Sequence, residues 1–369
     1  MSEKTPQILF IAPLPPPVHG SAMVSRQIKE SKVINDAYRC DFVNLSTSRR
    51  MDEIGKTTPV KLWRFASSYF KVLGKLLTRR YDLCYLAITC HGVGFLKDAP
   101  YVLLCKLFRR KIVIHQHNKG MSDDVDRPLY KWLLPSVYRN ADVILLSQYL
   151  YPDIEKVVKK EQVMICPNGI AAKEGIPVFD HQNTVPRIFF LSNLMESKGV
   201  FVLLDACKIL KDKGYSFKCD LVGGETKEID ATRFNEEVQK RGLDGIVVYH
   251  GRKYGADKEE YLQNSDIFVL PTSNDCFPLV LLEAMQNGLP CVSTPIGGIP
   301  DIIADGETGL LCESKNPSAL AESLEKLLAD KSLRVMMGES GLRRYKEKFT
   351  ETAFERNFIG CLDKSIKRS

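Results

Sequence analysis

The stretch DIFVLPTSNDCFPLVLLEAMQNGLPCVSTPIGG, residues 266–298, predicts a strand, a helix and a second strand in close succession. The apolar run Ile267–Leu270 is typical of a parallel strand that is buried on both faces. Pro278 has the φ angle that a first helical residue needs, so we expect a short helix over Leu279–Asn287. Cys291–Thr294 predicts the next buried strand. A helix that starts at the carboxyl end of a parallel strand directs free N–H groups into the crevice there, which suits a diphosphate.

Two acidic residues bracket this helix start. Asp275 precedes the helix and Glu283 lies within it, with seven residues between them. This acid-x7-Glu pattern, with Phe-Pro-Leu after the first acid and then Glu-Ala-Met and Gly-x-Pro-x-Val, resembles the signature of retaining GT-B glycosyltransferases of family four, which use nucleotide sugars. Family members usually carry Glu where this chain has Asp275. Taken alone, the two acids would be interpreted as an N-cap aspartate and a surface glutamate.

The resemblance implies an α/β protein of the GT-B fold, in which two Rossmann-like, doubly wound domains face each other across a cleft. We expect residues 1–175 to form the N-terminal, acceptor-side domain and residues 186–349 the C-terminal domain, which binds the nucleotide sugar. Residues 350–369 should form a helix that packs back on the first domain. The boundary is placed at 171–186, which lacks hydrophobic periodicity and carries two prolines.

Length and composition agree with a soluble globular protein of two domains. The chain has 369 residues, of which 44% are hydrophobic and 26% charged. No apolar run approaches the roughly 20 residues that span a membrane, and the first run, Gln7–Ala12, is too short for a secretory signal. The 11 cysteines include no C-x-x-C pair, so we expect buried thiols and neither disulfides nor structural zinc.

Short apolar runs alternate with helical stretches through both halves, which favours parallel sheets covered by helices. The strands that we expect are Ile8–Ala12, Asp41–Leu45, Leu83–Ile88, Ile112–His115, Val143–Leu146, Val163–Cys166, Arg187–Leu191, Cys219–Val222, Ile246–Tyr249, Ile267–Leu270 and Cys291–Thr294. No G-x-G-x-x-G motif follows the first strand, so a dinucleotide site is not indicated.

Two residues of the first half match positions that face the cleft in the resembled family. Gly20 ends the loop Pro13–Gly20, which corresponds to a Gly-rich loop that positions donor phosphate or acceptor. His117 follows a predicted strand and matches a histidine that contacts the donor sugar, with His115 as the alternative. A simple loop and a core histidine are the structural alternatives. The two histidines have no third ligand near them in sequence, so no metal site is predicted.

The loop Ser192–Gly199, SNLMESKG, resembles the family's Arg-x4-Lys-Gly motif, whose two cations neutralise the donor diphosphate. Lys198 fits the second cation, but Asn193 stands at the position of the arginine. Arg252 is therefore a candidate for the missing charge. Gly223 ends another predicted strand with a turn that can pass close to a ligand.

The implied reaction is transfer of a sugar from a UDP-, GDP- or ADP-linked donor to an acceptor hydroxyl, with retention at the anomeric carbon and without metal or other cofactor. Helix N–H groups and one lysine would stabilise the leaving diphosphate. The catalytic candidates are His117, Lys198 and Asp275, and the donor-binding candidates are Gly20, Asn193, Gly223, Arg252, Phe277, Leu279, Val280 and Glu283. Two alternatives are a nucleotide-sugar epimerase of the same fold and a catalytically inactive nucleotide-sugar-binding protein.

Charge is distributed unevenly along the chain. Residues 1–180 contain 27 Lys and Arg against 17 Asp and Glu, whereas residues 181–369 contain 25 against 28. Lys61–Arg80 has six basic residues, no acidic residue and apolar residues at helical spacing, which predicts an amphipathic helix whose apolar arc is widened by Trp63 and Phe70. Arg49-Arg50 and Arg109–Lys111 could extend this basic surface.

A basic amphipathic helix suits an anionic membrane surface, although a helix packed on the sheet with a solvated basic face is the alternative. The sequence contains no recognised nucleic-acid-binding module, so no nucleic acid is expected. We therefore expect a cytoplasmic protein bound peripherally to the inner face of the plasma membrane. Its acceptor would be a lipid-linked saccharide in the synthesis of cell-surface polysaccharide, lipopolysaccharide, capsule or glycolipid.

Overall fold

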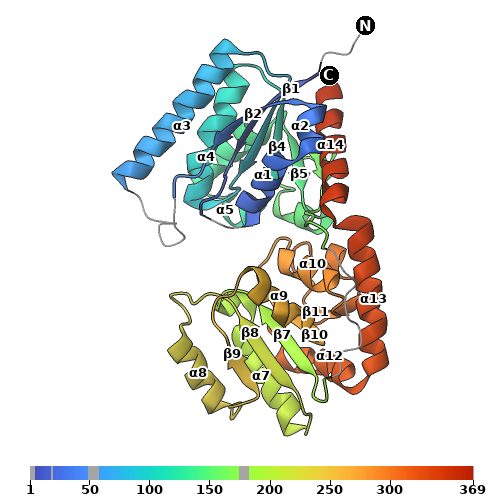
Figure 1. Ribbon diagram of the computed structural model, residues 1–369. Coiled ribbons are helices and arrows are strands. Elements are labelled where there is room, and N and C mark those ends of the chain that lie inside the picture. Colours follow the sequence, from blue (N-terminus) through green and yellow to red (C-terminus); the bar gives the residue numbers. More distant parts are fainter. Residues whose placement is uncertain (1–4, 18–19, 49–57, 174–182, 369) are drawn as a thin grey trace. The chain divides into compact units, whose positions relative to one another are not determined.

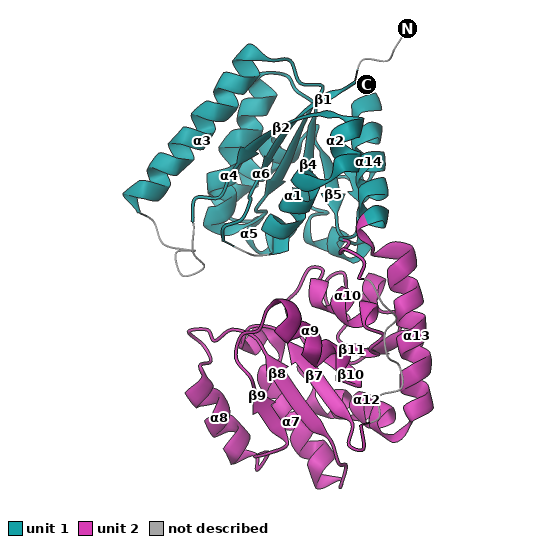
Figure 2. Ribbon diagram, in the orientation of Figure 1, with its two compact units in different colours: residues 1–168, 352–369 teal, residues 169–351 magenta. Residues whose placement is uncertain are grey.

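The computed structural model describes residues 5–17, 20–48, 58–173 and 183–368. The chain divides into two compact units, coloured separately in Figure 2. Unit 1 comprises Met1–Asn168 and Thr352–Ser369, and unit 2 comprises Gly169–Glu351. Part of the expected linker, residues 174–182, lies outside the described residues, as do Arg49 and Arg50.

Unit 1 is built on one six-stranded parallel sheet with the strand order β2-β1-β3-β4-β5-β6. Its strands are β1 (Gln7–Ala12), β2 (Arg39–Asn44), β3 (Leu83–Ile88), β4 (Ile112–Gln116), β5 (Asp142–Leu145) and β6 (Val163–Ile165). Its helices are α1 (Gly20–Glu30), α2 (Lys32–Ala37), α3 (Pro59–Thr78), α4 (Gly92–Leu107), α5 (Met121–Asp124), α6 (Pro128–Tyr138) and α14 (Glu351–Lys367), with 3-10 turns at Gln148–Asp153 and Lys160–Gln162. Since all strands run parallel, their carboxyl ends share one edge of the sheet.

Helices cover both faces of this sheet (Figure 1). Helix α3 packs on α4, and α4 packs on α6. The last helix, α14, shares a hydrophobic core with α1, α2 and the inner residues of the strands. Its Phe358 ring lies 5.3 Å from that of Tyr85, edge to face. The C-terminal helix therefore belongs to the first unit, as the sequence predicted.

Unit 2 has a second six-stranded parallel sheet, with the order β12-β11-β10-β7-β8-β9. Its strands are β7 (Arg187–Leu191), β8 (Lys218–Val222), β9 (Val247–Tyr249), β10 (Ile267–Leu270), β11 (Cys291–Ser293) and β12 (Gly309–Leu311). Its helices are α7 (Val200–Asp212), α8 (Ala231–Lys240), α9 (Gly255–Gln263), α10 (Leu279–Gln286), α11 (Ile299–Ile302), α12 (Pro317–Ala329) and α13 (Lys331–Lys348), with a 3-10 turn at Glu196–Lys198. Two doubly wound parallel sheets are what the sequence predicted.

Two local predictions need correction. Pro278 is the residue before helix α10 and not its first residue, because its ψ of 114° is extended. Strand β12 was not predicted from the sequence. Among the described residues, no helix is both long and apolar enough to cross a membrane.

Candidate functional site

The loops after the neighbouring strands β7 and β10 of unit 2 meet at an ion pair. Lys198 Nζ lies 2.5 Å from Asp275 Oδ2, and the two side chains are 23% and 17% exposed. The loops fit closely because Gly199 has a φ of 81° and no side chain: a Cβ there would lie 2.1 Å from the carbonyl oxygen of Pro271. Lys198 therefore lies beside the loop that joins β10 to α10.

Helix α10 begins directly after this ion pair. The N–H groups of its first residues, Leu279 and Val280, have no carbonyl one turn earlier within the helix, so its N-terminus carries partial positive charge. Phe277 anchors the approach to the helix, because its ring is buried and packs edge to face against Phe349 at 5.9 Å. Gly297 allows the loop after β11 to approach the residues that precede α10, since a Cβ at Gly297 would lie 2.2 Å from the carbonyl oxygen of Asp275.

Glu283 lies one turn inside α10, and its carboxylate is already paired. Lys258 Nζ, on α9, lies 2.8 Å from Glu283 Oε2, with 25% and 22% of the two side chains exposed. Lys258 is a residue that the sequence analysis missed, because its helix carries no motif that singles it out. The pair fixes the direction of the Glu283 carboxylate without removing it from solvent.

A glycine turn follows β8 beside the loop that carries Asn193. A Cβ at Gly223 would lie 1.7 Å from the carbonyl oxygen of Ser192, so only glycine allows this close approach. Asn193 Oδ1 accepts a hydrogen bond of 3.1 Å from the N–H of Gly224. The hydroxyl of Tyr249, on β9, donates to the carbonyl of Gly223 at 2.9 Å. These contacts join the ends of β7, β8 and β9 into one backbone platform.

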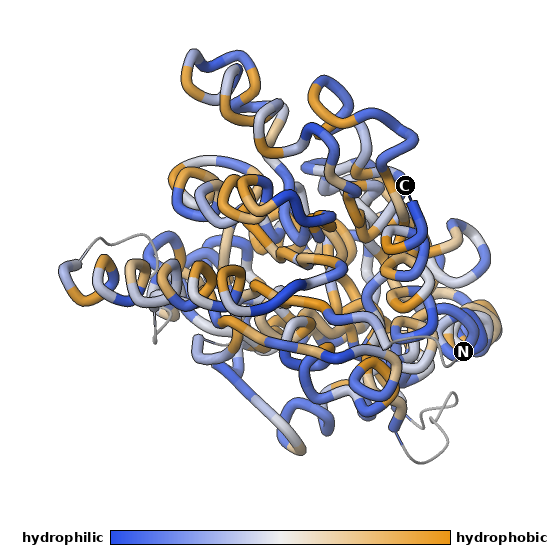
Figure 3. The backbone as a smooth tube through the Cα atoms, turned by 90° about the horizontal axis from the view of Figure 1, so that it is seen from above, coloured by the Kyte–Doolittle hydropathy of each residue, from blue (hydrophilic) through white to orange (hydrophobic). Residues whose placement is uncertain are grey.

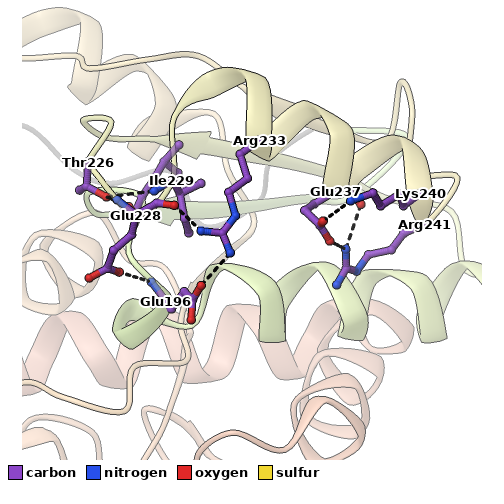
Figure 4. Close-up of polar contacts among 9 residues, drawn as sticks. Glu196, Thr226, Glu228, Ile229, Arg233, Glu237, Lys240 and Arg241 are labelled. Carbon is purple, nitrogen blue, oxygen red and sulfur yellow. Dashed lines mark hydrogen bonds and ion pairs between the residues drawn. The ribbon is translucent and has the colours of Figure 1, made fainter.

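Polar contacts link the loop after β7 to the loop after β8 and to helix α8 (Figure 4). The Glu228 carboxylate accepts from the N–H of Glu196 at 3.2 Å, and Arg233, on α8, forms an ion pair of 2.8 Å with Glu196. Thr226 Oγ1 accepts from the N–H groups of Glu228 and Ile229 at 3.1 and 3.3 Å. The loop after β7 is therefore tied to two neighbouring elements, the loop after β8 and helix α8.

The two candidates of the first half lie in unit 1. Gly20 is the exposed first residue of α1. His117 follows β4, and its ring lies 4.1 Å from that of His115. His115 is fully buried and shares a 2.8 Å hydrogen bond between Nδ1 and the Tyr85 hydroxyl. Burial, and then the neighbouring His117, lower the pKa of His115 well below its usual range. His115 is thus a core histidine, and His117 is the one nearer the strand's end.

In the described residues, no group of three or more His, Cys, Asp or Glu side chains is arranged to hold a metal ion. All 11 cysteines lie in the described residues, and no disulfide joins any two of them.

Comparison with known proteins finds a family likeness in the second unit. Residues 172–344 match the family model described as Glycosyl transferases group 1. The match lies within unit 2 and is a likeness to that family. One relative is the capsular polysaccharide biosynthesis glycosyltransferase CapM of Staphylococcus aureus, 31% identical over 165 residues, which are 44% of this chain and 42% of CapM. The chain spans about half the length, or less, of the curated relatives that it matches.

Solved structures extend the likeness of fold to the whole chain. Sucrose-phosphate synthase from Thermosynechococcus elongatus has a TM-score of 0.75 at 19% identity and covers 97% of this chain and 98% of its own. Anabaena Alr3699/HepE, in complex with UDP-glucose, has a TM-score of 0.73 at 17% identity, with 97% and 99% covered. The predicted GT-B fold of two Rossmann-like domains is confirmed.

Within the part of the chain that matches the group 1 model, the structure brings the sequence-predicted residues into two neighbouring sets. One set combines Lys198, Asp275 and the start of α10, and the other combines Asn193, Gly223 and Arg252 around the glycine turn. Both sets lie at the carboxyl edge of the sheet, on loops after four adjacent strands. A cation, helix N–H groups and a carboxylate at this edge can hold a diphosphate beside a polar, uncharged group such as a sugar.

Proposed function

We propose that this protein is a retaining glycosyltransferase that moves a sugar from a nucleotide diphosphate sugar to an acceptor hydroxyl. The observation that carries the proposal is the Lys198–Asp275 ion pair at the N-terminus of α10, inside a group 1 glycosyltransferase domain. The family match favours transfer over epimerisation or simple binding. The solved HepE complex with UDP-glucose supports a nucleotide sugar as the class of donor.

The ion pair explains how the site changes when donor binds. The leaving diphosphate gains negative charge as the glycosidic bond breaks, so Lys198 and the N–H groups of Leu279 and Val280 would stabilise it. Lys198 would then exchange Asp275 for phosphate oxygens. Asp275, released from its partner, would accept hydrogen bonds from sugar hydroxyls and favour the positive charge that develops on the ring. This charge stabilisation needs no metal, so we propose that transfer is metal-independent.

The proposal also gives roles in donor binding to other residues of the two units. Glu283, held by Lys258, would accept hydrogen bonds from the ribose hydroxyls of the donor nucleotide. Phe277 would keep the helix start rigid through its packing on Phe349. For His117 and the loop at Gly20, which lie in unit 1, the proposed roles are those that the resemblance implies, namely orienting the donor sugar and positioning donor phosphate or acceptor. These assignments are part of the same proposal.

The acceptor side of the proposal depends on α3. Its packed stripe is formed by residues such as Val72 and Leu76, whereas Trp63, Phe70 and Leu77 are 71%, 66% and 67% exposed. The spacing of seven residues places these three side chains along one outer face of the helix. Figure 3 shows hydrophobic and hydrophilic residues alternating along α3. An exposed apolar stripe on a helix without acidic residues is typical of binding to an anionic membrane.

We therefore propose a lipid-linked saccharide as acceptor, presented at the inner face of the plasma membrane, in the synthesis of capsule, lipopolysaccharide or a related glycan. CapM, a capsular polysaccharide glycosyltransferase by name, supports this class of pathway. Several of the predicted basic residues in and after α3 have other partners. Lys75 and Arg79 both pair with Asp41, at 2.8 Å each, and Arg64 donates to the carbonyl of Thr47 at 2.7 Å. Lys111 likewise donates to the carbonyl of Ile366. The membrane contact would therefore use the exposed apolar stripe of Trp63, Phe70 and Leu77 together with Lys71 and Arg80.

The test is a thermal-shift screen of UDP-, GDP- and ADP-sugars, because a bound donor stabilises the folded state. The donor that stabilises the protein is then incubated with membrane extract as acceptor source, with and without EDTA. We expect acceptor-dependent release of nucleoside diphosphate, unchanged by EDTA, and a product whose anomeric configuration by NMR equals that of the donor. Release that is strongly reduced in Lys198→Ala would support the site. Epimerised donor sugar without acceptor, or binding without release, would contradict the proposal.

A further inference from the structure

The donor site described above has one cation, Lys198, where the resembled motif has two. The position of the other cation is occupied by Asn193, a neutral side chain whose carbonyl oxygen accepts the Gly224 N–H at 3.1 Å. Asn193 therefore fixes the glycine turn and contributes no charge. A diphosphate carries two or more negative charges, so a second cation would add to the stabilisation that Lys198 and the helix N–H groups provide.

Arg252 places a cation beside this glycine turn. It follows β9, two strands from β7, directly after Gly251, whose φ is 70°. Its guanidinium lies over Gly224: a Cβ at Gly224 would be 2.1 Å from an Nη atom and 2.7 Å from Nε. Gly224 is the residue that Asn193 binds, so guanidinium and amide lie on the same turn. The absence of a side chain at Gly224 is what lets the guanidinium occupy this place.

Arg252 also differs from the other arginines of unit 2. Within the described residues, each of the others has a polar partner. Arg187, Arg233 and Arg241 form ion pairs with carboxylates, namely Asp220, Glu196, and Asp205 with Glu237. Arg334 and Arg344 donate to the carbonyls of Leu327 and Ile302, and Arg343 donates to the hydroxyl of Ser340. Two of these pairs are visible in Figure 4. Arg252 is exposed and forms no hydrogen bond or ion pair with any described residue. Its five N–H donors are thus available to an anion.

Neighbouring contacts limit where this guanidinium can go. The N–H of Gly223 donates to the carbonyl of Gly251 at 3.0 Å, which ties the loop of Arg252 to the glycine turn. The hydroxyl of Tyr249, three residues before Arg252, donates to the Gly223 carbonyl of the same turn. The base of the Arg252 side chain is therefore fixed, while its charged end rests on a surface of backbone atoms. A planar fork so placed is suited to two phosphate oxygens at once.

We propose that Arg252 is the second cation of the donor diphosphate site, supplied from the loop after β9 in place of the residue at position 193. The proposal rests on the proposed function, because it names a contact within the same nucleotide-sugar site. Lys198 and Arg252 then hold the diphosphate from the two ends of the platform formed after β7, β8 and β9, and Asn193 keeps the turn between them in position.

The experiment measures binding of the nucleoside diphosphate, among UDP, GDP and ADP, that wild type binds most tightly, together with its monophosphate and its nucleoside. Calorimetry is run on wild type, Arg252→Gln, Arg252→Lys and a matched control, Arg343→Gln, which removes an exposed arginine on α13 of the same unit. We expect Arg252→Gln to weaken diphosphate binding about 10- to 100-fold, the range for losing hydrogen bonds to a charged group. The monophosphate should weaken much less and the nucleoside not at all.

Further outcomes separate this inference from the proposed function. Partial retention in Arg252→Lys, and recovery of diphosphate binding in the double variant Arg252→Gln with Asn193→Arg, would support the relocated cation. Equal diphosphate binding by wild type and Arg252→Gln would overturn it, as would an equal loss for diphosphate and nucleoside. If wild type binds none of the three diphosphates, the proposed function itself is contradicted. An unchanged melting temperature in Arg252→Gln confirms that any loss is local.

Discussion

Lys198 Nζ and Asp275 Oδ2 lie 2.5 Å apart, joining the loops that follow the neighbouring strands β7 and β10. The two groups neutralise each other in the donor-free domain. A diphosphate must therefore displace a carboxylate to reach the lysine. This exchange makes Asp275 a residue whose charge, length and position can be tested separately.

We predict that Asp275→Glu retains most transfer activity, because the longer side chain keeps the charge that the related motif usually carries. Asp275→Asn should lose about 2–4 kcal/mol of transition-state stabilisation, a 30- to 1,000-fold fall in kcat/KM, because the amide keeps the shape but not the charge. Initial rates of nucleoside diphosphate release measure both. Equal activity of wild type, Glu and Asn forms would show that the charge of Asp275 has no part in transfer.

A second prediction concerns Lys258 and Glu283, whose side chains lie 2.8 Å apart. If Lys258 positions Glu283 for the ribose, Lys258→Met should raise the donor KM several-fold and leave kcat nearly unchanged. Glu283→Gln should raise the KM for donor more strongly, since it removes the acceptor itself. The double variant should be no worse than Glu283→Gln, because a positioning residue has no effect once the residue that it holds is gone.

Additive losses in that double variant would mean that Lys258 contacts the donor directly. A substitution of Lys240 serves as the control, because Lys240 forms a similar ion pair with Glu237 on α8, within one helix and apart from α10. Lys240→Met should leave the donor KM unchanged.

The sequence predicted the parts of this site that depend on local pattern. Apolar runs such as Ile267–Leu270 mark strands, and Pro278 marks the start of the helix that carries Glu283. Lys258 could not be predicted, because it reaches Glu283 only through the packing of α9 beside α10, and nothing in its own helix distinguishes it. The unpaired state of Arg252 was equally invisible, since it depends on which partners the other arginines find.

Helix α3 shows the same limit in another form. Its length and amphipathic character were predictable from the three-to-four spacing of apolar residues. The spacing did not separate the residues that pack, such as Val72, from those that face outward, such as Trp63 and Phe70. Nor did it show that Asp41, 34 residues before Lys75, neutralises part of the basic face. Both facts follow from tertiary contacts with the sheet.

The third prediction concerns pH and the buried His115. Its pKa is lowered well below the usual range by burial and then by His117, so it is neutral in the folded unit. The unfolded chain binds a proton there below about pH 6.5. The free energy of unfolding should therefore fall as pH drops below about 6.5, by up to about 1.4 kcal/mol per pH unit for this one group.

Denaturant unfolding of wild type and His115→Gln between pH 5 and 8 measures this effect. Gln can still accept a hydrogen bond from Tyr85 but cannot titrate, so its unfolding free energy should depend less on pH between 5 and 6.5, whatever its value at pH 8. A slope that is the same in both proteins would contradict the prediction.

The last prediction tests the membrane contact of α3. Trp63 and Phe70 are 71% and 66% exposed, so replacing both with serine should leave the fold intact and weaken cosedimentation with anionic vesicles. Lys71→Gln with Arg80→Gln should weaken it separately and in a salt-sensitive way, since each basic residue contributes about 1 kcal/mol and is screened within about 10 Å at 0.1 M salt. Activity on a short soluble acceptor should survive in both variants. Met336→Ser, which removes an exposed apolar residue of unit 2, should bind vesicles like wild type. If wild type does not cosediment with anionic vesicles at low salt, the exposed stripe of α3 has another role and the lipid-linked acceptor loses its structural support.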